Sequence, residues 1–263
     1  MTLQNITNKQ QGIPKLLYRF RFLNSNHIQQ FLHYSNRPDS NELLKDLTIK
    51  EYIRRMYDDK IIGKNRVPAV YSLKRNGVRL LKQLGIGDDA VLHKLYYEEK
   101  RTDSFIGHCL LIATICCQLD KKESDILSYE YTTQADLAAP DNPFHFLKDS
   151  GLVVDLCFSK KQKGRKKQYY LLTIFDGTLP KYRIRKRIKD YYQFYFYNEW
   201  ENSIDVPFPK IILIFPTLQL LIYAKRLTKT LLEQDEEVGL SFYFALAEDV
   251  KKFGITGEIW ETI

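Results

Sequence analysis

The fold of this chain is decided by LLYRFRFLNSNHIQQFLHYSNRPDSNELLKDLTIKEYIRRMYDDK, residues 16–60, and by VPAVYSLKRNGVRLLKQL, residues 67–84. In both segments apolar residues recur at the spacing of a helix face, and short aromatic and β-branched runs lie between them. The pattern predicts three helices, a two-stranded wing and a last helix. This is the arrangement of a winged helix-turn-helix, which lays one helix in a groove of duplex DNA.

The predicted helix starts rest on capping residues. Pro14 is placed in the first turn of the first helix, where its missing N–H would be unpaired in any case. Ser25 is expected to cap the second helix, and Asp39 or Ser40 the third, because their oxygens accept hydrogen bonds from free backbone donors. The third helix is the expected recognition helix, and its apolar side is formed by Leu43, Leu44 and Leu47.

The wing follows directly. Strands are predicted near Tyr52–Met56 and Val70–Leu73, with a wing loop from Lys60 to Pro68 and a last helix from Arg75 to Leu84. Glu51 stands in the turn before the wing, where glycine is frequent. A residue other than glycine needs a different turn there, or accepts a left-handed conformation at a cost of roughly 1 kcal/mol.

The residues expected to contact DNA are polar or basic and face away from the predicted core. Asn41 and Lys45 are expected to reach base edges from the third helix, because amide and ammonium groups pair with adenine and guanine. Lys50 completes the set on this helix. The wing is expected to grip phosphate or the minor groove through Lys60, Lys64, Asn65 and Arg66. The open alternative is a winged helix that serves only to bind another protein.

The net charge of +8 is unevenly distributed. Residues 1–100 contain 18 Lys and Arg against 10 Asp and Glu, so the whole excess lies with the predicted DNA reader. A second basic region, residues 160–189, holds 12 basic side chains and a single acid, Asp176. Basic surfaces bind duplex DNA by releasing counterions from its phosphates, so the distribution favours a nucleic-acid partner.

Composition excludes several other classes of protein. With 263 residues and 44% hydrophobic content, the chain is long enough for two domains and is not disordered. The sequence shows no secretory signal, apolar run of membrane-spanning length or lipidation motif, so a cytoplasmic protein without a membrane partner is expected. The four cysteines are expected to be reduced core residues, and the five histidines lack the spacing of metal ligands. No nucleotide-binding or nucleophile motif is present.

After a connector, the second half predicts a layered α/β domain. A buried helix is expected near 105–119, strands near 126–133, 152–158 and 169–175, a helix near 180–197, and a buried strand at 210–215. The order αβββαβ matches the core of restriction-endonuclease-like nucleases. A further helix near 217–232, a strand near 240–246 and a final short helix extend it.

The helix near 180–197 is expected to have two different faces. Ile184, Ile188, Tyr191 and Tyr195 form an apolar stripe, which is expected in the core. Its basic side is a candidate for phosphate contact, and its members are Lys181, Arg185 and Lys189. The basic run KKQKGRKK at 160–167 is predicted to form the tip of a hairpin, which either is solvated or contacts nucleic acid.

The whole pattern resembles the replication-relaxation proteins of plasmids and other mobile elements. LYRFRFLNSNHIQQFL, LLKDLTIKEYIRRM and AVYSLKRNGVRLL are similar to the winged-helix half of that family. HCLLIATI, VVDLCF, FDGTLPKYRIRKRIKDYY, PKIILIFP, FYFALAEDV and GEIW follow the order of its second half. The resemblance implies an accessory protein of replication, relaxation or transfer that binds double-stranded DNA, with a relaxase or a replication initiator as a possible partner.

These observations predict an α/β (α+β) protein with three segments. Residues 1–86 are expected to form the winged helix-turn-helix, residues 87–103 a connector, and residues 104–263 the restriction-endonuclease-like domain. The last domain is expected to be catalytically degenerate. The oligomeric state and the DNA sequence recognised do not follow from the chain.

An active nuclease of that fold needs carboxylates on the second and third strands to hold a divalent metal such as Mg²⁺. Asp155 lies where the first would fall, but the positions of the second correspond to Thr173 and Phe175. Asp176 replaces them only if a bulge or strand end turns it to the same side, because neighbouring strand residues point to opposite faces. Glu130 is a further acid on the first strand. No cofactor is expected unless Asp155 and Asp176 form this site.

Three functions are therefore compatible with the sequence. The first is the DNA-binding accessory protein, which predicts duplex binding without metal. The second is a transcriptional regulator of a mobile element, which predicts a dimer bound to its own promoter. The third is a metal-dependent nuclease that uses Asp155 and Asp176, which predicts DNA cleavage with magnesium or manganese.

Overall fold

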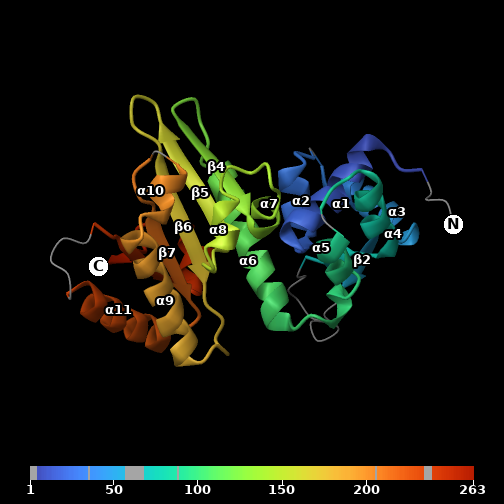
Figure 1. Ribbon diagram of the computed structural model, residues 1–263. Coiled ribbons are helices and arrows are strands. Elements are labelled where there is room, and N and C mark those ends of the chain that lie inside the picture. The colour runs from blue at the N-terminus through green and yellow to red at the C-terminus, as the bar shows by residue number, and fades with distance from the viewer. Residues whose placement is uncertain (1–4, 35, 57–67, 88, 205, 234–238) are drawn as a thin grey trace. The chain divides into compact units, whose positions relative to one another are not determined.

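A computed structural model describes residues 5–34, 36–56, 68–87, 89–204, 206–233 and 239–263 (Figure 1). The chain forms two compact units, residues 1–117 and 118–263, and the division falls inside helix α6 (Asp103–Asp120). Helices and two sheets together make a mixed α/β protein, as predicted. In the described part of the chain, no helix is both long enough and apolar enough to cross a membrane.

Unit 1 contains short helices around a three-stranded antiparallel sheet with the order β1-β3-β2. In chain order its elements before α6 are α1 (Asn8–Phe20), β1 (Phe22–Asn24), α2 (Ser25–Phe31), α3 (Arg37–Ile49), β2 (Ile53–Met56), β3 (Val70–Leu73), α4 (Arg75–Gln83), α5 (Asp89–Leu95) and the 3₁₀ helix η1 (Glu98–Lys100). The predicted helices and both predicted strands are present. Strand β1 was not predicted, because three residues are too few to show an alternating pattern.

The helix starts lie upstream of the predicted ones. Thr7 caps α1 in a reciprocal capping box with Gln10, so Pro14 stands inside the helix and not in its first turn. Asn24 caps α2 instead of Ser25, and Asn36 caps α3 instead of Asp39 or Ser40. Asparagine, serine and aspartate cap helices about equally well, so the sequence alone does not show which of several nearby residues is the N-cap.

The core of unit 1 is built from the predicted apolar stripes. Leu17, Leu44 and Leu47 are buried, whereas Leu43 is only half-buried. Full burial of such a side chain stabilises a fold by roughly 1.5–3 kcal/mol. Gly77 in α4 is required by close packing, since a Cβ there would lie 2.3 Å from the carbonyl oxygen of Tyr52.

The segment expected to be a connector is part of unit 1. Within residues 87–103, Leu92 and Leu95 are buried, and Glu98 is only 2% exposed. Glu98 accepts a hydrogen bond from Arg21 Nε at 3.1 Å and lies 3.8 Å from Arg101 Nε. Ion pairs and buried leucines therefore hold this segment against the rest of unit 1. The polar composition of the segment had instead suggested a connector.

Unit 2 is organised by a six-stranded sheet with the order β4-β5-β6-β7-β8-β9. Strands β4, β5 and β6 are antiparallel neighbours, β6, β7 and β8 run parallel, and β9 is antiparallel to β8. The strands are β4 (Leu127–Thr133), β5 (Leu156–Gln162), β6 (Gln168–Ile174), β7 (Lys210–Phe215), β8 (Phe242–Leu246) and β9 (Glu261–Thr262). The helices are α7 (Gln134–Leu137), α8 (Phe146–Asp149), α9 (Lys181–Phe196), α10 (Glu199–Ser203), α11 (Leu218–Leu232) and α12 (Ala247–Phe253).

The start of β5 differs from the prediction. The strand begins at Leu156 and not at Leu152, and it continues to Gln162, so the first part of the basic run at 160–167 is strand. The apolar side chains of Leu152 and Val154 pack against the core, but these residues precede β5 and do not pair with a neighbouring strand. Apolar character alone therefore misplaced the strand by four residues.

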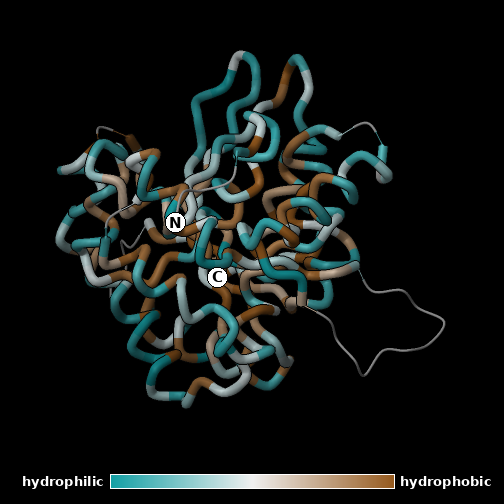
Figure 2. The backbone as a smooth tube through the Cα atoms, turned by 90° about the vertical axis from the view of Figure 1, so that its right-hand side faces the viewer, coloured by the Kyte–Doolittle hydropathy of each residue, from teal (hydrophilic) through white to brown (hydrophobic). Residues whose placement is uncertain are grey.

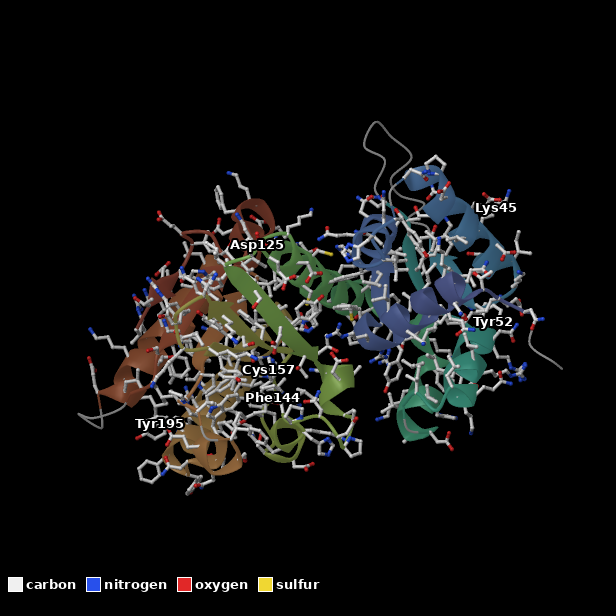
Figure 3. The ribbon with its side chains drawn as sticks, turned by 90° about the horizontal axis from the view of Figure 1, so that it is seen from above. Lys45, Tyr52, Asp125, Phe144, Cys157 and Tyr195 are labelled. Atoms are coloured by element: carbon white, nitrogen blue, oxygen red, sulfur yellow. The ribbon has the colours of Figure 1, made fainter. Side chains whose placement is uncertain are left out.

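Helices α9 and α11 pack on the same face of the sheet (Figure 1). The buried residues of this face include Cys157, Leu171, Leu213 and Phe244, and Cys157 is labelled within it in Figure 3. Burial raises the pKa of the Cys157 thiol to about 12. All four cysteines are buried and none forms a disulfide bond, as predicted.

Replacement of Glu98 tests the ion cluster of unit 1. We expect Glu98→Ala to lower the free energy of unfolding by about 3 kcal/mol, because two arginines lose a buried partner. Glu99→Ala is the matched control, since Glu99 forms an exposed pair with Arg54 and its loss costs below about 1 kcal/mol. Peptide-resolved hydrogen exchange is the measurement, because it assigns the loss to unit 1. Equal effects of the two variants would contradict the role of Glu98.

Candidate nucleic-acid interface

The outward face of α3 is where the sequence placed its recognition residues. Asn41 and Lys45, one helical turn apart, are both exposed, and Figure 3 labels Lys45 on this helix. Ile49 continues the same face and is 70% exposed. The face therefore offers an amide, an ammonium group and an apolar tip in succession, which are the three chemistries that read base edges in the major groove.

Lys50 differs from these residues in its surroundings. It is the C-cap of α3, and its Nζ lies 2.8 Å from Asp46 Oδ2 and 3.4 Å from the carbonyl oxygen of Asn5. The hydrogen bond from Lys50 lowers the pKa of the Asp46 carboxyl group. The charge of Lys50 is thus partly neutralised within unit 1, so its predicted contact with DNA would require this pair to open.

The turn after α3 is left-handed at Glu51, one of the two conformations expected there. Glu51 has φ +60°, its N–H donates to the Thr48 carbonyl at 3.2 Å, and the Tyr52 N–H donates to the Leu47 carbonyl at 3.0 Å. This pair of bonds is the Schellman motif, with glutamate in the position that glycine usually fills. The Glu51 side chain accepts a hydrogen bond from Lys74 Nζ at 2.7 Å, which lowers the pKa of the Glu51 carboxyl group.

The two strands predicted to form the wing are paired, but the predicted tip of the wing lies outside the described residues. Strands β2 and β3 are antiparallel, with Met56 opposite Val70. The predicted contacts Lys60, Lys64, Asn65 and Arg66 fall within residues 57–67, which the structure does not describe. They stay predictions from the sequence.

The two faces of α9 are separated as predicted. Ile184, Ile188 and Tyr191 are buried, and Tyr195 is half-buried. Lys181, Arg185 and Lys189 are exposed. Tyr223 of α11 lies beside this basic face, with its ring centroid 5.2 Å from Lys181 Nζ and its hydroxyl 3.5 Å from Arg185. The face therefore presents positive charge next to an aromatic ring, which suits a phosphate-bearing ligand.

The β5–β6 hairpin forms a second basic surface in unit 2. Lys163, Arg165 and Lys166 are exposed at its tip, and Gly164 has the positive φ that the turn requires. Figure 1 shows the hairpin in yellow, projecting from the sheet, and Figure 2 shows its tip in the colour of hydrophilic residues. Lys167 is paired with Glu130 of β4 at 2.5 Å.

Asp155 and Asp176, the candidate nuclease acids, both have local hydrogen-bonding roles. Asp155 is 3% exposed, and its Oδ2 accepts a bond from the Ile174 N–H at 2.7 Å, while Oδ1 accepts one from Gln134 Nε2 at 3.1 Å. Asp176 Oδ1 accepts bonds from the Thr178 N–H and hydroxyl at 2.8 and 2.9 Å. Asp155 thus links the start of β5 to the end of β6, and Asp176 stabilises the turn that follows β6.

The surroundings of Asp155 are polar but contain no described metal cluster. Thr173, at one position of the missing second acid, donates or accepts a 2.7 Å hydrogen bond with the Tyr191 hydroxyl. Phe175, at the other, is buried and stacks on Phe215. Within the described ranges, no group of three or more His, Cys, Asp or Glu side chains is placed to hold a metal ion.

Two features of the surface were not predicted from the sequence. The exposure of Ile49 was missed because an isoleucine at the end of a helix is usually assigned to its apolar side. An aromatic pocket on the sheet of unit 2 was missed because its members come from seven separate segments. Only the alternation of each strand could have indicated it, by putting Phe158, Lys160 and Tyr170 on one face.

The comparison with known families gives one match. The model of the family described as replication-relaxation matches residues 15–206, which is more than half of the chain. Among curated proteins, no match was found.

Two replacements of Glu51 test the conformation of the turn after α3. Both Glu51→Gly and Glu51→Ala lose the contact with Lys74, but only glycine adopts a positive φ without steric cost. We expect the glycine variant to have a free energy of unfolding about 1 kcal/mol higher than the alanine variant. Denaturant titration of the full chain measures the difference. Identical values would show that the turn is not left-handed in solution.

Proposed function

The chain belongs to the replication-relaxation family, and from this we propose that it is a DNA-binding accessory protein of plasmid or mobile-element replication, relaxation or transfer. The family gives a role in replication or relaxation. The mode of action proposed for this chain is duplex binding through a winged helix in unit 1. The observation on which this depends most is the exposed face of α3, with Asn41 and Lys45 one turn apart.

Three further properties of unit 1 support a winged helix that binds DNA. Helices α1, α2 and α3 precede the β2–β3 pair, and α4 follows it, which is the element order of such domains. The short strand β1 pairs with β3 and extends this pair to three strands. The net positive charge of the first 100 residues supplies the attraction to phosphate.

We propose that unit 2 is a restriction-endonuclease-like domain that binds DNA or protein without cleaving DNA. Apart from the short helices α7, α8 and α10, the elements follow the order α6-β4-β5-β6-α9-β7, with β4–β6 antiparallel and β7 parallel to β6, and this order supports the proposed fold. Both oxygens of Asp155 are engaged by the protein, and Asp176 forms its own turn. The basic faces of α9 and of the β5–β6 hairpin offer the contact surfaces, and a relaxase or a replication initiator is the protein partner we propose.

Charge reversal on α3 tests the DNA-binding proposal. We expect Lys45→Glu to weaken binding to a fluorescein-labelled random-sequence duplex about tenfold, equivalent to ~1.4 kcal/mol, because the charge nearest the groove changes sign. Lys15→Glu is the matched control, because Lys15 is also exposed, lies on α1 and gives the same change in net charge. Fluorescence anisotropy at several salt concentrations measures both affinities.

Two outcomes of that experiment would oppose the proposal. If Lys15→Glu weakens binding as much as Lys45→Glu, net charge and not α3 determines affinity. If neither variant changes affinity, unit 1 is a protein-binding module. Charge reversal of Lys64 and Arg66 in the same assay tests the wing, and unchanged affinity would remove the wing from the interface.

The absence of cleavage is tested with the purified full chain. We expect supercoiled, linear and branched DNA to remain uncut after incubation with magnesium or manganese, because the acids available to hold a metal are engaged elsewhere. Gel electrophoresis of the products is the measurement. Metal-dependent cleavage that disappears in Asp155→Asn would establish the nuclease instead, whereas cleavage that persists in this variant would indicate a contaminant.

A further inference from the structure

The face of the six-stranded sheet opposite α9 and α11 contains a pocket of about 190 Å³ in unit 2. The register of the strands assembles it. Phe158 lies opposite Tyr170, Tyr170 lies opposite Lys210, and Tyr129 lies opposite Lys160, so all five side chains share one face. The rings of Phe158 and Tyr170 are stacked with centroids 4.6 Å apart. The floor of the pocket is therefore a rigid aromatic surface.

The opposite wall is held by a glutamine at the end of α6. Gln118 Nε2 donates to the carbonyl of Val250 at 3.2 Å, and its Oε1 accepts from the N–H of Ile255 at 3.0 Å. The Ile255 carbonyl in turn accepts a 3.2 Å hydrogen bond from the indole Nε1 of Trp260. This chain of bonds fixes the Trp260 ring at the pocket and leaves its faces for packing.

The charge of the pocket is positive. Lys160 and Lys210 line it, and no aspartate or glutamate is among the residues that do. Among described side chains, neither lysine has an ion-pair partner, and Lys210 Nζ instead lies 5.2 Å from the ring centroid of Tyr243. Burial raises the pKa of Tyr170 to about 12, so its hydroxyl stays neutral and adds no negative charge at physiological pH. A flat aromatic group that bears an anion matches this lining.

We propose that this pocket binds one unpaired nucleotide of single-stranded DNA, with the base among Tyr170, Tyr243 and Trp260 and a phosphate at Lys160 and Lys210. Pockets for drug-sized ligands measure about 300–1,000 Å³, so this smaller one admits a base while sugar and phosphate remain at its mouth. Base stacking on aromatic side chains with nearby cations is the usual way in which proteins hold single strands. The assignment to DNA rests on the proposed function; the pocket itself does not.

Tryptophan fluorescence offers a direct measurement. The chain has two tryptophans, and Trp200 is fully buried in the core, so quenching by a ligand reports Trp260. The probe is a short oligothymidylate, compared with an abasic oligonucleotide that has the same phosphates. We expect the abasic strand to bind about 5- to 100-fold more weakly, because it lacks the stacking bases. Equal affinity of the two strands would overturn the proposal.

Matched variants locate the site. We expect Lys160→Gln combined with Lys210→Gln to weaken oligothymidylate binding about tenfold or more. Lys121→Gln combined with Lys122→Gln removes the same charge from two exposed positions after α6, outside the pocket and the hairpin, and is expected to change affinity by less than about threefold. Equal effects of the two double variants would show that general charge, and not the pocket, binds the strand.

Two further measurements distinguish a free nucleotide from single-stranded DNA as the ligand, and the pocket proposal from the proposal of duplex binding by unit 1. Thymidine monophosphate is expected to compete only weakly; binding of this monophosphate without binding of the oligonucleotide would overturn the assignment to DNA. Lys160→Gln with Lys210→Gln is expected to retain duplex affinity, and Lys45→Glu to retain quenching by the oligonucleotide. If unit 1 failed to bind duplex DNA, the test of the pocket with the oligonucleotide would therefore still be valid. If the pocket failed to bind the oligonucleotide, the test of duplex binding would likewise still be valid.

Discussion

The outward face of α3 depends on a small set of hydrogen bonds that tie the end of this helix to the start of α4. The Lys74 N–H donates to the Tyr52 carbonyl at 3.0 Å, the Asn76 N–H to the Glu51 carbonyl at 3.2 Å, and the Asn76 side chain to the Lys50 carbonyl at 3.0 Å. Gly77 allows the close approach that these bonds need. The carbonyls of Leu47 and Thr48 at the end of α3 are paired by the Tyr52 and Glu51 N–H groups, and the bonds to Lys50, Glu51 and Tyr52 then tie the following turn to the start of α4.

Much of the fold was predictable because burial repeats with the period of each element. The apolar stripes of α3 and α9 and the run at β7 were identified correctly, since their side chains meet a core on one face or on both. Features that depend on distant partners were not. Strand β1 exists only by pairing with β3, and the first strand of the β5–β6 pair was misplaced because Leu152 and Val154 are buried without pairing.

The two faces of the unit 2 sheet explain why its candidate sites were only partly predictable. Asp155 was identified from its place in a predicted strand, and it lies just before the first residue of β5. A buried carboxylate that accepts a backbone N–H has the same sequence pattern as a metal ligand. Its partners, Ile174 and Gln134, lie about 20 residues away in opposite directions along the chain. The aromatic pocket is formed by cross-strand register, which no single segment contains.

Glu130 affects how the edge of the unit 2 sheet can contact another molecule. It lies at the centre of β4, which is an edge strand of the six-stranded sheet, and its side chain is 71% exposed. An edge strand offers unpaired N–H and carbonyl groups to any other chain, and charged side chains there oppose such pairing. A neighbouring molecule that extended the sheet at β4 would have to approach the charged pair of Glu130 and Lys167, so this pair opposes edge-to-edge association at β4.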